Sequence, residues 1–207
     1  MSTFTDFIEL KLERTCLVVK IIFMRSALFL LSSSRADGNS ELLAREAAKQ
    51  LPESVGQRWI NLNECPLGAF HDVRHAGERT YEMPEGNARM LVDATLWADY
   101  LIFVAPVYWY SMPAPAKLYL DHWSHWMRVP ELNFRKRMKG KRLFLTTAMA
   151  GAKPVEAEPL LKSLQLTADY MGMEWGGYVL AHANSAGDVL QQPEALLSAR
   201  SLFEHLV

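Results

Sequence analysis

Runs of consecutive apolar residues alternate along the chain with longer segments whose apolar residues recur every three or four positions. The apolar runs predict strands at residues 27–31, 58–62, 100–105, 143–147 and 174–180. The periodic segments predict helices at residues 41–51, 87–98, 113–126, 156–171 and 194–206. This alternation predicts an α/β fold, with one open five-stranded parallel sheet and helices on both of its faces.

The third apolar run, residues 100–105, has no polar interruption and is typical of a central parallel strand covered on both faces. Ligands of such sheets bind beyond the carboxyl ends of the strands, where the strand order reverses. The loops that follow the predicted strands and should lie together at this edge are residues 32–40, 106–113 and 147–154. The long polar connection at residues 63–86 has no clear period and is interpreted as a lid or a dimer contact.

The first of these loops, residues 32–40, combines serines, an arginine, a glycine and an asparagine directly before a predicted helix. Free backbone N–H groups and the positive end of the helix dipole favour an anion at such a position. Serine hydroxyls and Arg35 add hydrogen-bond donors, and Gly38 permits a tight turn. The loop is therefore interpreted as a phosphate-binding loop.

The other two loops suit a flat ligand. Residues 106–113 place three consecutive aromatics between two prolines, and aromatic faces can stack on a planar heterocycle, although a dimer interface is an alternative. Residues 147–151 are small apart from Met149, so the backbone can approach such a ring closely. Together, the three loops predict a mononucleotide site for a large planar base.

Composition narrows the functional classes. The net charge of −1 over 207 residues gives no reason to expect nucleic acid or an anionic membrane as a partner. The two cysteines, Cys16 and Cys65, form neither a zinc framework nor a disulfide scaffold, which fits a reducing cytoplasm. His122 and His125 lie near Asp121 on a predicted helix, but without further ligands they are interpreted as structural, and no metal is predicted.

The N-terminus is set apart as residues 1–24, an extension preceding a domain at residues 25–207. Its apolar run is too short and too charged to span a bilayer. Residues 1–23 are interpreted as a misassigned start upstream of Met24, the alternative being an extra strand or arm. The basic run at residues 135–142 is interpreted as a solvated lead-in to a strand, the alternative being a contact with the 2′-phosphate of NADPH.

The loop at residues 32–40 and the aromatic loop, followed by Lys117 and Asp121, resemble the NAD(P)H-dependent FMN and quinone reductases of the flavodoxin-like fold. The resemblance covers residues 25–207. It implies that the first loop holds the FMN phosphate and that the other two contact the isoalloxazine ring. The implied cofactor-binding residues are Ser32, Ser34, Arg35, Asn39, Ser40, Pro106, Val107, Tyr108, Trp109, Tyr110, Thr147, Ala148 and Gly151.

The implied reaction passes a hydride from NAD(P)H to FMN, and then two electrons to a quinone, a flavin or a similar small acceptor. The flavin performs this chemistry, so no catalytic side chain is named. A homodimer or homotetramer is expected, because one aromatic rim would leave the flavin partly open. The alternatives are a flavodoxin-like electron carrier and a non-catalytic flavin-binding regulatory module.

Overall fold

A computed structural model describes residues 25–73, 75 and 81–206 of the chain. The interpretation of residues 1–24 as an extension therefore concerns residues outside this description. Within the described residues, no helix is both long enough and apolar enough to cross a membrane.

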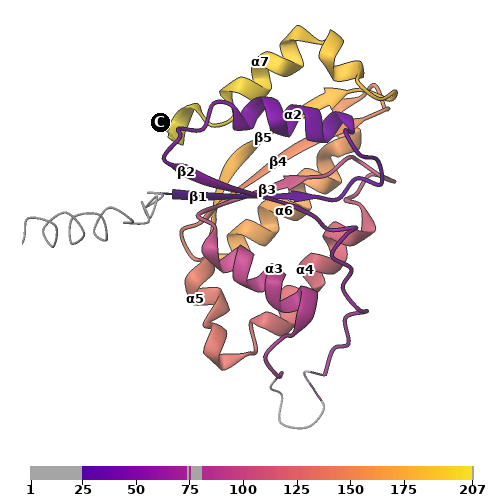
Figure 1. Ribbon diagram of the computed structural model, residues 1–207. Coiled ribbons are helices and arrows are strands. Elements are labelled where there is room, and N and C mark those ends of the chain that lie inside the picture. The colour runs from indigo at the N-terminus through magenta and orange to yellow at the C-terminus, as the bar shows by residue number, and fades with distance from the viewer. Residues whose placement is uncertain (1–24, 74, 76–80, 207) are drawn as a thin grey trace, which may run out of the picture.

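A single parallel sheet forms the centre of the structure (Figure 1). Its strands are β1 (Arg25–Leu31), β2 (Val55–Asn61), β3 (Tyr100–Val104), β4 (Arg142–Met149) and β5 (Glu174–His182). They are hydrogen-bonded in the order β2-β1-β3-β4-β5, and every neighbouring pair is parallel. The predicted open five-stranded parallel sheet is thus confirmed, with β3 at its centre.

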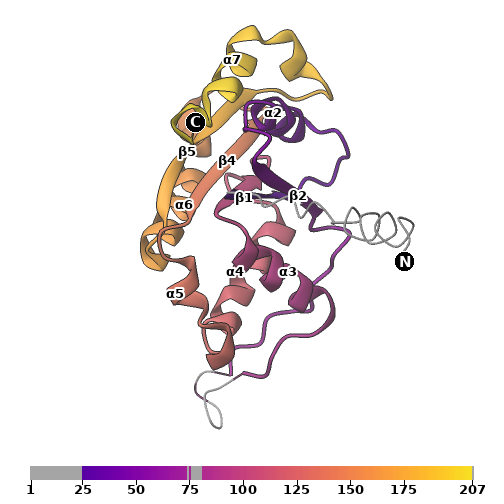
Figure 2. The ribbon, with the colours of Figure 1, turned by 60° about the vertical axis from the view of Figure 1, so that its left-hand side comes forward.

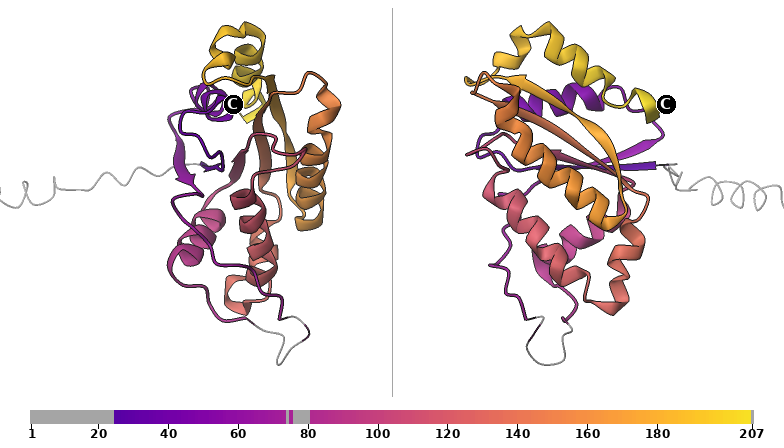
Figure 3. Two further views of the ribbon diagram at one scale, coloured as in Figure 1. Left: turned by 90° about the vertical axis from the view of Figure 1, so that its right-hand side faces the viewer. Right: turned by 180° about the vertical axis from the view of Figure 1, so that it is seen from behind.

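Helices cover both faces of the sheet, as Figures 1 and 2 show. One face carries α2 (Asn39–Ala48) and α7 (Pro193–Ser201), which pack against each other. The opposite face carries α3 (Gly86–Trp97), α4 (Ala114–Trp126), α5 (Phe134–Met138) and α6 (Glu158–Met171). The two helical layers are separated by the sheet in the side view of Figure 3.

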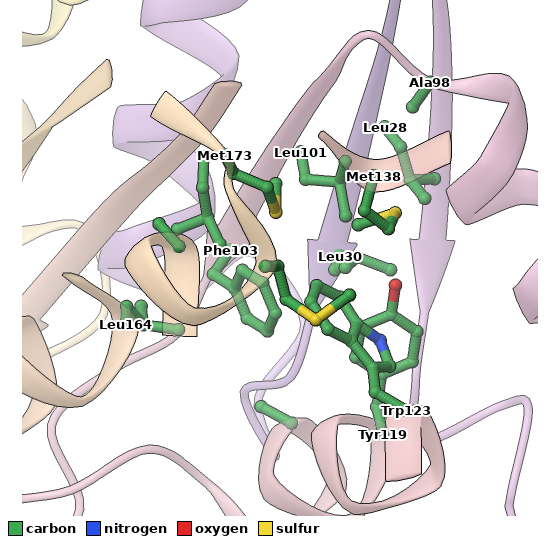
Figure 4. Close-up of a cluster of buried hydrophobic side chains, with 14 of the residues drawn as sticks. Leu28, Leu30, Ala98, Leu101, Phe103, Tyr119, Trp123, Met138, Leu164 and Met173 are labelled. Atoms are coloured by element: carbon green, nitrogen blue, oxygen red, sulfur yellow. The ribbon is translucent and has the colours of Figure 1, made fainter. Parts of the chain in front are cut away.

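Alternation along the strands divides the apolar core in two. On β3, Leu101 and Phe103 face the layer of α3 to α6, whereas Ile102 and Val104 face α2 and α7. Figure 4 shows both Leu101 and Phe103 in this part of the core, and the ring of Phe103 contacts that of Tyr119 of α4. Each such fully buried side chain stabilises the fold by about 1.5–3 kcal/mol relative to an exposed one. This double coverage explains why the run has no polar residue.

The interpretation of the basic run as a solvated lead-in to a strand is correct for residues 139–141, which precede β4, and wrong for residues 135–138. The first part of the run forms the short helix α5, because Phe134 and Met138 lie four residues apart and are both buried against the core. The basic side chains between them are exposed. A pair of apolar residues one turn apart therefore decides the local structure, and the basic residues between them occupy the solvent-exposed side of the helix.

The long connection between β2 and α3 is held against α4 (Figure 1). The Nε2 atom of His122 donates to the Gly68 carbonyl at 2.9 Å, and Nε2 of His125 donates to the Glu82 carbonyl at 2.8 Å. These two histidines thus tether a segment that forms no helix or strand in its described part.

Candidate functional site

The three loops expected to lie together meet at the carboxyl edge of the sheet, and a fourth loop joins them. They enclose a cleft of about 210 Å³. Its lining comes from the loops after β1, β3, β4 and β5, from the start of α2 and from the end of β4: Ser33, Arg35, Gly38, Asn39, Ser40, Pro106, Val107, Tyr108, Ala148, Met149, Ala150, Ala183, Asn184 and Ala186.

The amino end of α2 forms one wall of the cleft. The first backbone N–H groups of any helix lack intrahelical acceptors, and here they belong to Asn39 and Ser40. The Ser40 hydroxyl is buried and has no hydrogen-bond partner among the described residues. A buried hydroxyl without a partner is costly, so its position in the wall indicates a ligand that completes its hydrogen bonding. Thr146 fixes this end of the helix, because its Oγ1 donates to the Ser40 carbonyl at 3.2 Å.

Gly38 immediately precedes α2 and is buried beneath the same loop. A Cβ atom at this position would lie 3.2 Å from the Ser33 hydroxyl oxygen, so a larger residue would press on a residue of the cleft wall. The exposed Arg35 guanidinium stands at the mouth. A helix amino end, an unpartnered hydroxyl and an arginine together form a donor set suited to a phosphate.

The loop after β5, residues 183–187, is a part of the site that sequence reasoning missed. The Asn39 side chain donates to the Ser185 carbonyl at 2.8 Å and accepts from the Val189 N–H at 3.4 Å. Arg35 Nη1 donates to the Asn184 carbonyl at 3.1 Å. The Asn39 side chain thus ties the start of α2 to residues 185–189. Because these bonds use the side chain, the backbone N–H of Asn39 remains for a ligand. The signal available in the sequence was that a fifth parallel strand must also end at this edge.

The aromatic loop contains a tight turn. Tyr108 and Ser111 exchange two backbone hydrogen bonds, at 2.9 and 3.0 Å. Between them, Trp109 and Tyr110 have φ values of +50° and +63°. Turns with two positive φ values favour asparagine and glycine, and bulky residues in this conformation are strained by about 1–3 kcal/mol each.

The strained turn points its aromatics outward. The Trp109 side chain is 94% exposed and that of Tyr110 is 56% exposed, and neither lines the cleft. The structure therefore does not bring these two predicted ring contacts to the cleft of a single chain. Strain at such exposed residues has no packing explanation within the described chain, which is typical of a functional segment.

Tyr108 does line the cleft, and its hydroxyl lies 3.1 Å from the Ser34 hydroxyl. Partial burial alone would raise the pKa of Tyr108, but hydrogen bonds with Ser34 and Ser33 and the charge of Arg35 outweigh it, so that the pKa is lowered. The local environment at this wall therefore favours negative charge.

The small-residue loop and the end of β4 supply Ala148, Met149 and Ala150 to the cleft lining. Val107 N–H donates to the Ala148 carbonyl at 3.0 Å, which joins this loop to the aromatic loop. The Thr147 hydroxyl is buried and lacks a partner among the described residues, although Thr147 does not line the cleft. The Gly151 carbonyl accepts a 2.6 Å hydrogen bond from His182 Nδ1, so its orientation is set by the end of β5.

The predicted site residues divide into two groups. The structure brings to the cleft Arg35, Asn39, Ser40, Pro106, Val107, Tyr108 and Ala148. Six predicted residues do not line the cleft: Ser32, Ser34, Trp109, Tyr110, Thr147 and Gly151. Ser32 is buried and its hydroxyl donates to the Val104 carbonyl at 3.2 Å, so its side chain supports the end of β3.

Two larger cavities lie elsewhere. One, of about 550 Å³, lies at the amino edge of the sheet and is lined by Arg25, Arg137, Lys139, Lys141 and Arg142, among others. The basic run therefore lies at the edge opposite the cleft, and the contact with the NADPH 2′-phosphate has no support within one chain.

The other cavity, an apolar groove of about 590 Å³, lies between residues 62–69 and the start of α4. Among the described residues, no group of three His, Cys, Asp or Glu side chains could hold a metal ion.

Comparison with known proteins gives one family and several relatives. A family model described as the flavodoxin-like fold matches residues 25–202. YwqN of Bacillus subtilis (strain 168), which carries the name of an NAD(P)H-dependent FMN-containing oxidoreductase, is 30% identical over 173 residues. The match covers 83% of this chain and 92% of YwqN.

Solved structures share the fold. The Trp repressor binding protein from Bacillus subtilis gives a TM-score of 0.68 at 24% identity, covering 87% of this chain and 97% of its own. An FMN-dependent NADH-azoreductase from Bacillus anthracis str. Ames Ancestor, solved in complex with FMN, gives a TM-score of 0.62 at 13% identity. That match covers 87% of this chain and 99% of the azoreductase. At these identities the two structures bear on the fold alone, and they agree with the predicted architecture.

Proposed function

The chain belongs to the flavodoxin-like fold family, and on that premise we propose that it is an FMN-dependent oxidoreductase that uses NAD(P)H to reduce a small acceptor. The name of its relative YwqN supports both FMN and NAD(P)H. The observation that carries the proposal is the buried Ser40 hydroxyl at the amino end of α2, which lies in the wall of a cleft and has no partner within the described residues.

The donors at this end of the cleft fit the phosphate of FMN. The backbone N–H groups of Asn39 and Ser40 and the Ser40 hydroxyl would bind it, and Arg35 would balance its charge. Glu41 brings a carboxylate into the first turn of the same helix, but Arg45 pairs with it and limits its repulsion of an anion.

The remaining walls fit a flat ring. Pro106, Val107 and Tyr108 would lie along it on one side, and Ala148 and its neighbours would allow close approach on the other. When bound, FMN supplies the hydride and electron transfer chemistry. The chain's own residues position the ring, favour negative charge near Tyr108 and leave an open side for access. We therefore assign no catalytic side chain.

We propose a quinone as the acceptor class, on the basis of the resemblance in the aromatic loop.

A homodimer is proposed as well, because Trp109 and Tyr110 are exposed beside the cleft and would be covered by a second copy. A cytoplasmic location is proposed because Cys65 is a free thiol within the described residues.

The first experiment adds FMN to the purified protein, removes free flavin by desalting and then adds NADPH anaerobically. We expect a retained yellow chromophore that bleaches promptly. Retained flavin that NADPH does not bleach would favour an electron carrier or a regulatory module instead. Loss of the flavin on desalting, confirmed by absence of binding in a titration, would overturn the assignment of the cleft.

A further inference from the structure

The apolar groove has the composition of a ligand site that nothing above uses. Its walls include Leu62, Leu67, Pro115 and Leu118, and Asn63 carries its one amide side chain. None of the described residues that line it carries a charged side chain. Its volume of about 590 Å³ lies within the usual range for small-molecule sites, about 300–1,000 Å³, which are mostly apolar with few polar groups.

Cys65 also lines the groove and keeps it uncharged. Burial, and to a smaller extent the negative charge of Glu64, raise the pKa of the Cys65 thiol. The thiol therefore stays protonated at neutral pH and acts as a weakly polar part of the wall. A charged ligand would find no opposite charge among the described residues of this groove, whereas an apolar ligand would lose little by leaving water.

The groove adjoins the cleft through two segments. Asn63 Nδ2 donates at 2.8 Å to the carbonyl of Ser33, which lines the cleft. The second wall continues from the aromatic loop, because Tyr108 lines the cleft and Ala114, six residues later, lines the groove. A molecule lying in the groove would thus have the cleft at its end.

We infer that the groove binds the apolar part of the electron acceptor, so that the enzyme prefers uncharged, lipophilic quinones to charged acceptors such as free flavin phosphates. This inference rests on the proposed function. The reaction is balanced as NAD(P)H, a proton and a quinone giving NAD(P)⁺ and a hydroquinone. The quinone gains two electrons and two protons. The hydride of NAD(P)H supplies both electrons and one proton, and solvent supplies the second proton.

The test compares naphthoquinones that share one ring and differ in the length of an alkyl substituent. With the FMN-loaded protein and NADPH, kcat/KM should rise about threefold to fourfold for each methylene that enters the groove, until the groove is full. A ring that carries a sulfonate in place of the alkyl group should show no such gain. Equilibrium dialysis of the same quinones without NADPH gives binding independently of turnover.

Two substitutions address the groove directly. Leu118→Arg places a charge in it, and Ala114→Trp fills it. Both should abolish the dependence on alkyl length, in turnover and in dialysis, while turnover of the unsubstituted ring and retention of FMN stay within twofold of wild type. The matched control is Leu166→Arg on the exposed face of α6, outside the groove, which should preserve the dependence.

The outcomes separate the two proposals. Flavin that NADPH does not bleach overturns the proposed function. Dialysis then still shows whether the groove binds the alkyl-substituted quinones. Bleachable flavin with no effect of alkyl length, or an effect that survives in both groove variants, overturns the groove assignment. If both variants instead convert a dimer to a monomer, by light scattering, without changing quinone binding, the groove is an interface between copies and the inference is wrong.

Discussion

The two edges of the sheet differ in how completely their polar groups are satisfied. At the amino edge the cavity is larger, about 550 Å³ against about 210 Å³ for the cleft. Its charges are largely engaged: Arg25 pairs with Asp99, Arg142 pairs with Glu174, and Lys141 donates to carbonyls at the end of α3. The carboxyl edge holds the strained turn and the Ser40 hydroxyl, which has no partner in the described part of the chain.

This difference shows that size is a poor guide to the functional edge. A cavity whose charges already pair with one another gains less from a ligand, since each new contact must replace an existing one. A buried hydroxyl without a partner and a strained exposed turn are costs that a folded chain retains where a ligand or partner compensates them. The comparison predicts that substitutions at the two edges will differ sharply in their effect on FMN.

The largest expected effect is on FMN affinity. Arg35→Ala and Ser40→Ala each remove a hydrogen bond to a charged group, worth about 1.5–3 kcal/mol, so each should raise the Kd for FMN by about tenfold or more. Arg137→Ala, which removes a cation from the amino-edge cavity, should leave the Kd within twofold. Fluorescence titration with FMN measures all three. An equal loss of FMN affinity in variants at both edges would contradict the expected difference between the edges. Unchanged affinity in Arg35→Ala and Ser40→Ala would contradict the assignment of the phosphate site.

A smaller effect is expected on stability. Asn and Gly tolerate the turn conformation, so the double substitution Trp109→Asn with Tyr110→Gly should raise the unfolding free energy by about 1–2 kcal/mol. For a chain of this size, that corresponds to a rise in Tm of about 2–8 °C. Little packing is lost within one chain, because both side chains are mostly exposed there. NADPH-driven turnover should fall in the same variant if the exposed aromatics serve the reaction.

The control for this prediction lies far from the cleft. Asn133 also has a positive φ, of +46°, but asparagine adopts that conformation readily. Asn133→Gly should therefore change Tm by less than the turn variant does. A turn variant that is less stable than wild type would show that its strain is smaller than the contacts made by the aromatics.

Some of this difference between the edges could be predicted from the sequence, and some could not. The carboxyl edge was predictable because parallel strands end together, and the core strands because apolar runs such as residues 100–105 must be covered on both faces. The loop at residues 183–187 was missed although a fifth parallel strand must also end at this edge, because the hydrogen bonds that tie it to Arg35 and Asn39 are accepted by backbone carbonyls. Carbonyls are present in every residue and leave no mark on the sequence.

Two further features lay beyond local pattern. The turn at Trp109 and Tyr110 contradicts turn propensity, since bulky residues disfavour positive φ, so the sequence alone does not predict it. The helix α5 was hidden among basic residues, because the burial that selects Phe134 and Met138 depends on a core formed by distant segments. Long-range packing therefore decides α5, whereas the exposed turn has no packing explanation within the described chain.

The smallest expected effect concerns pH, where the two edges share a direction and differ in cause. Burial, the largest influence, lowers the pKa of Lys141 at the amino edge; Asp99 raises it and Arg137 lowers it. The pKa of Tyr108 at the cleft is also lowered, although partial burial opposes this, because Ser34, Ser33 and Arg35 favour the phenolate. In both cases the unfolded chain keeps its proton to higher pH, so the unfolding free energy should rise with pH up to about 10.

Substitutions separate the two contributions. Lys141→Met removes the amino-edge contribution and Tyr108→Phe the cleft contribution, so each should flatten the rise of the unfolding free energy, measured by urea titration at a series of pH values. FMN should act on the cleft alone. Its phosphate adds negative charge near Arg35, which should move the phenolate titration of Tyr108 back toward higher pH without changing the contribution of Lys141. A response of the Lys141 contribution to FMN, absent in Lys141→Met, would place the flavin at the other edge of the sheet.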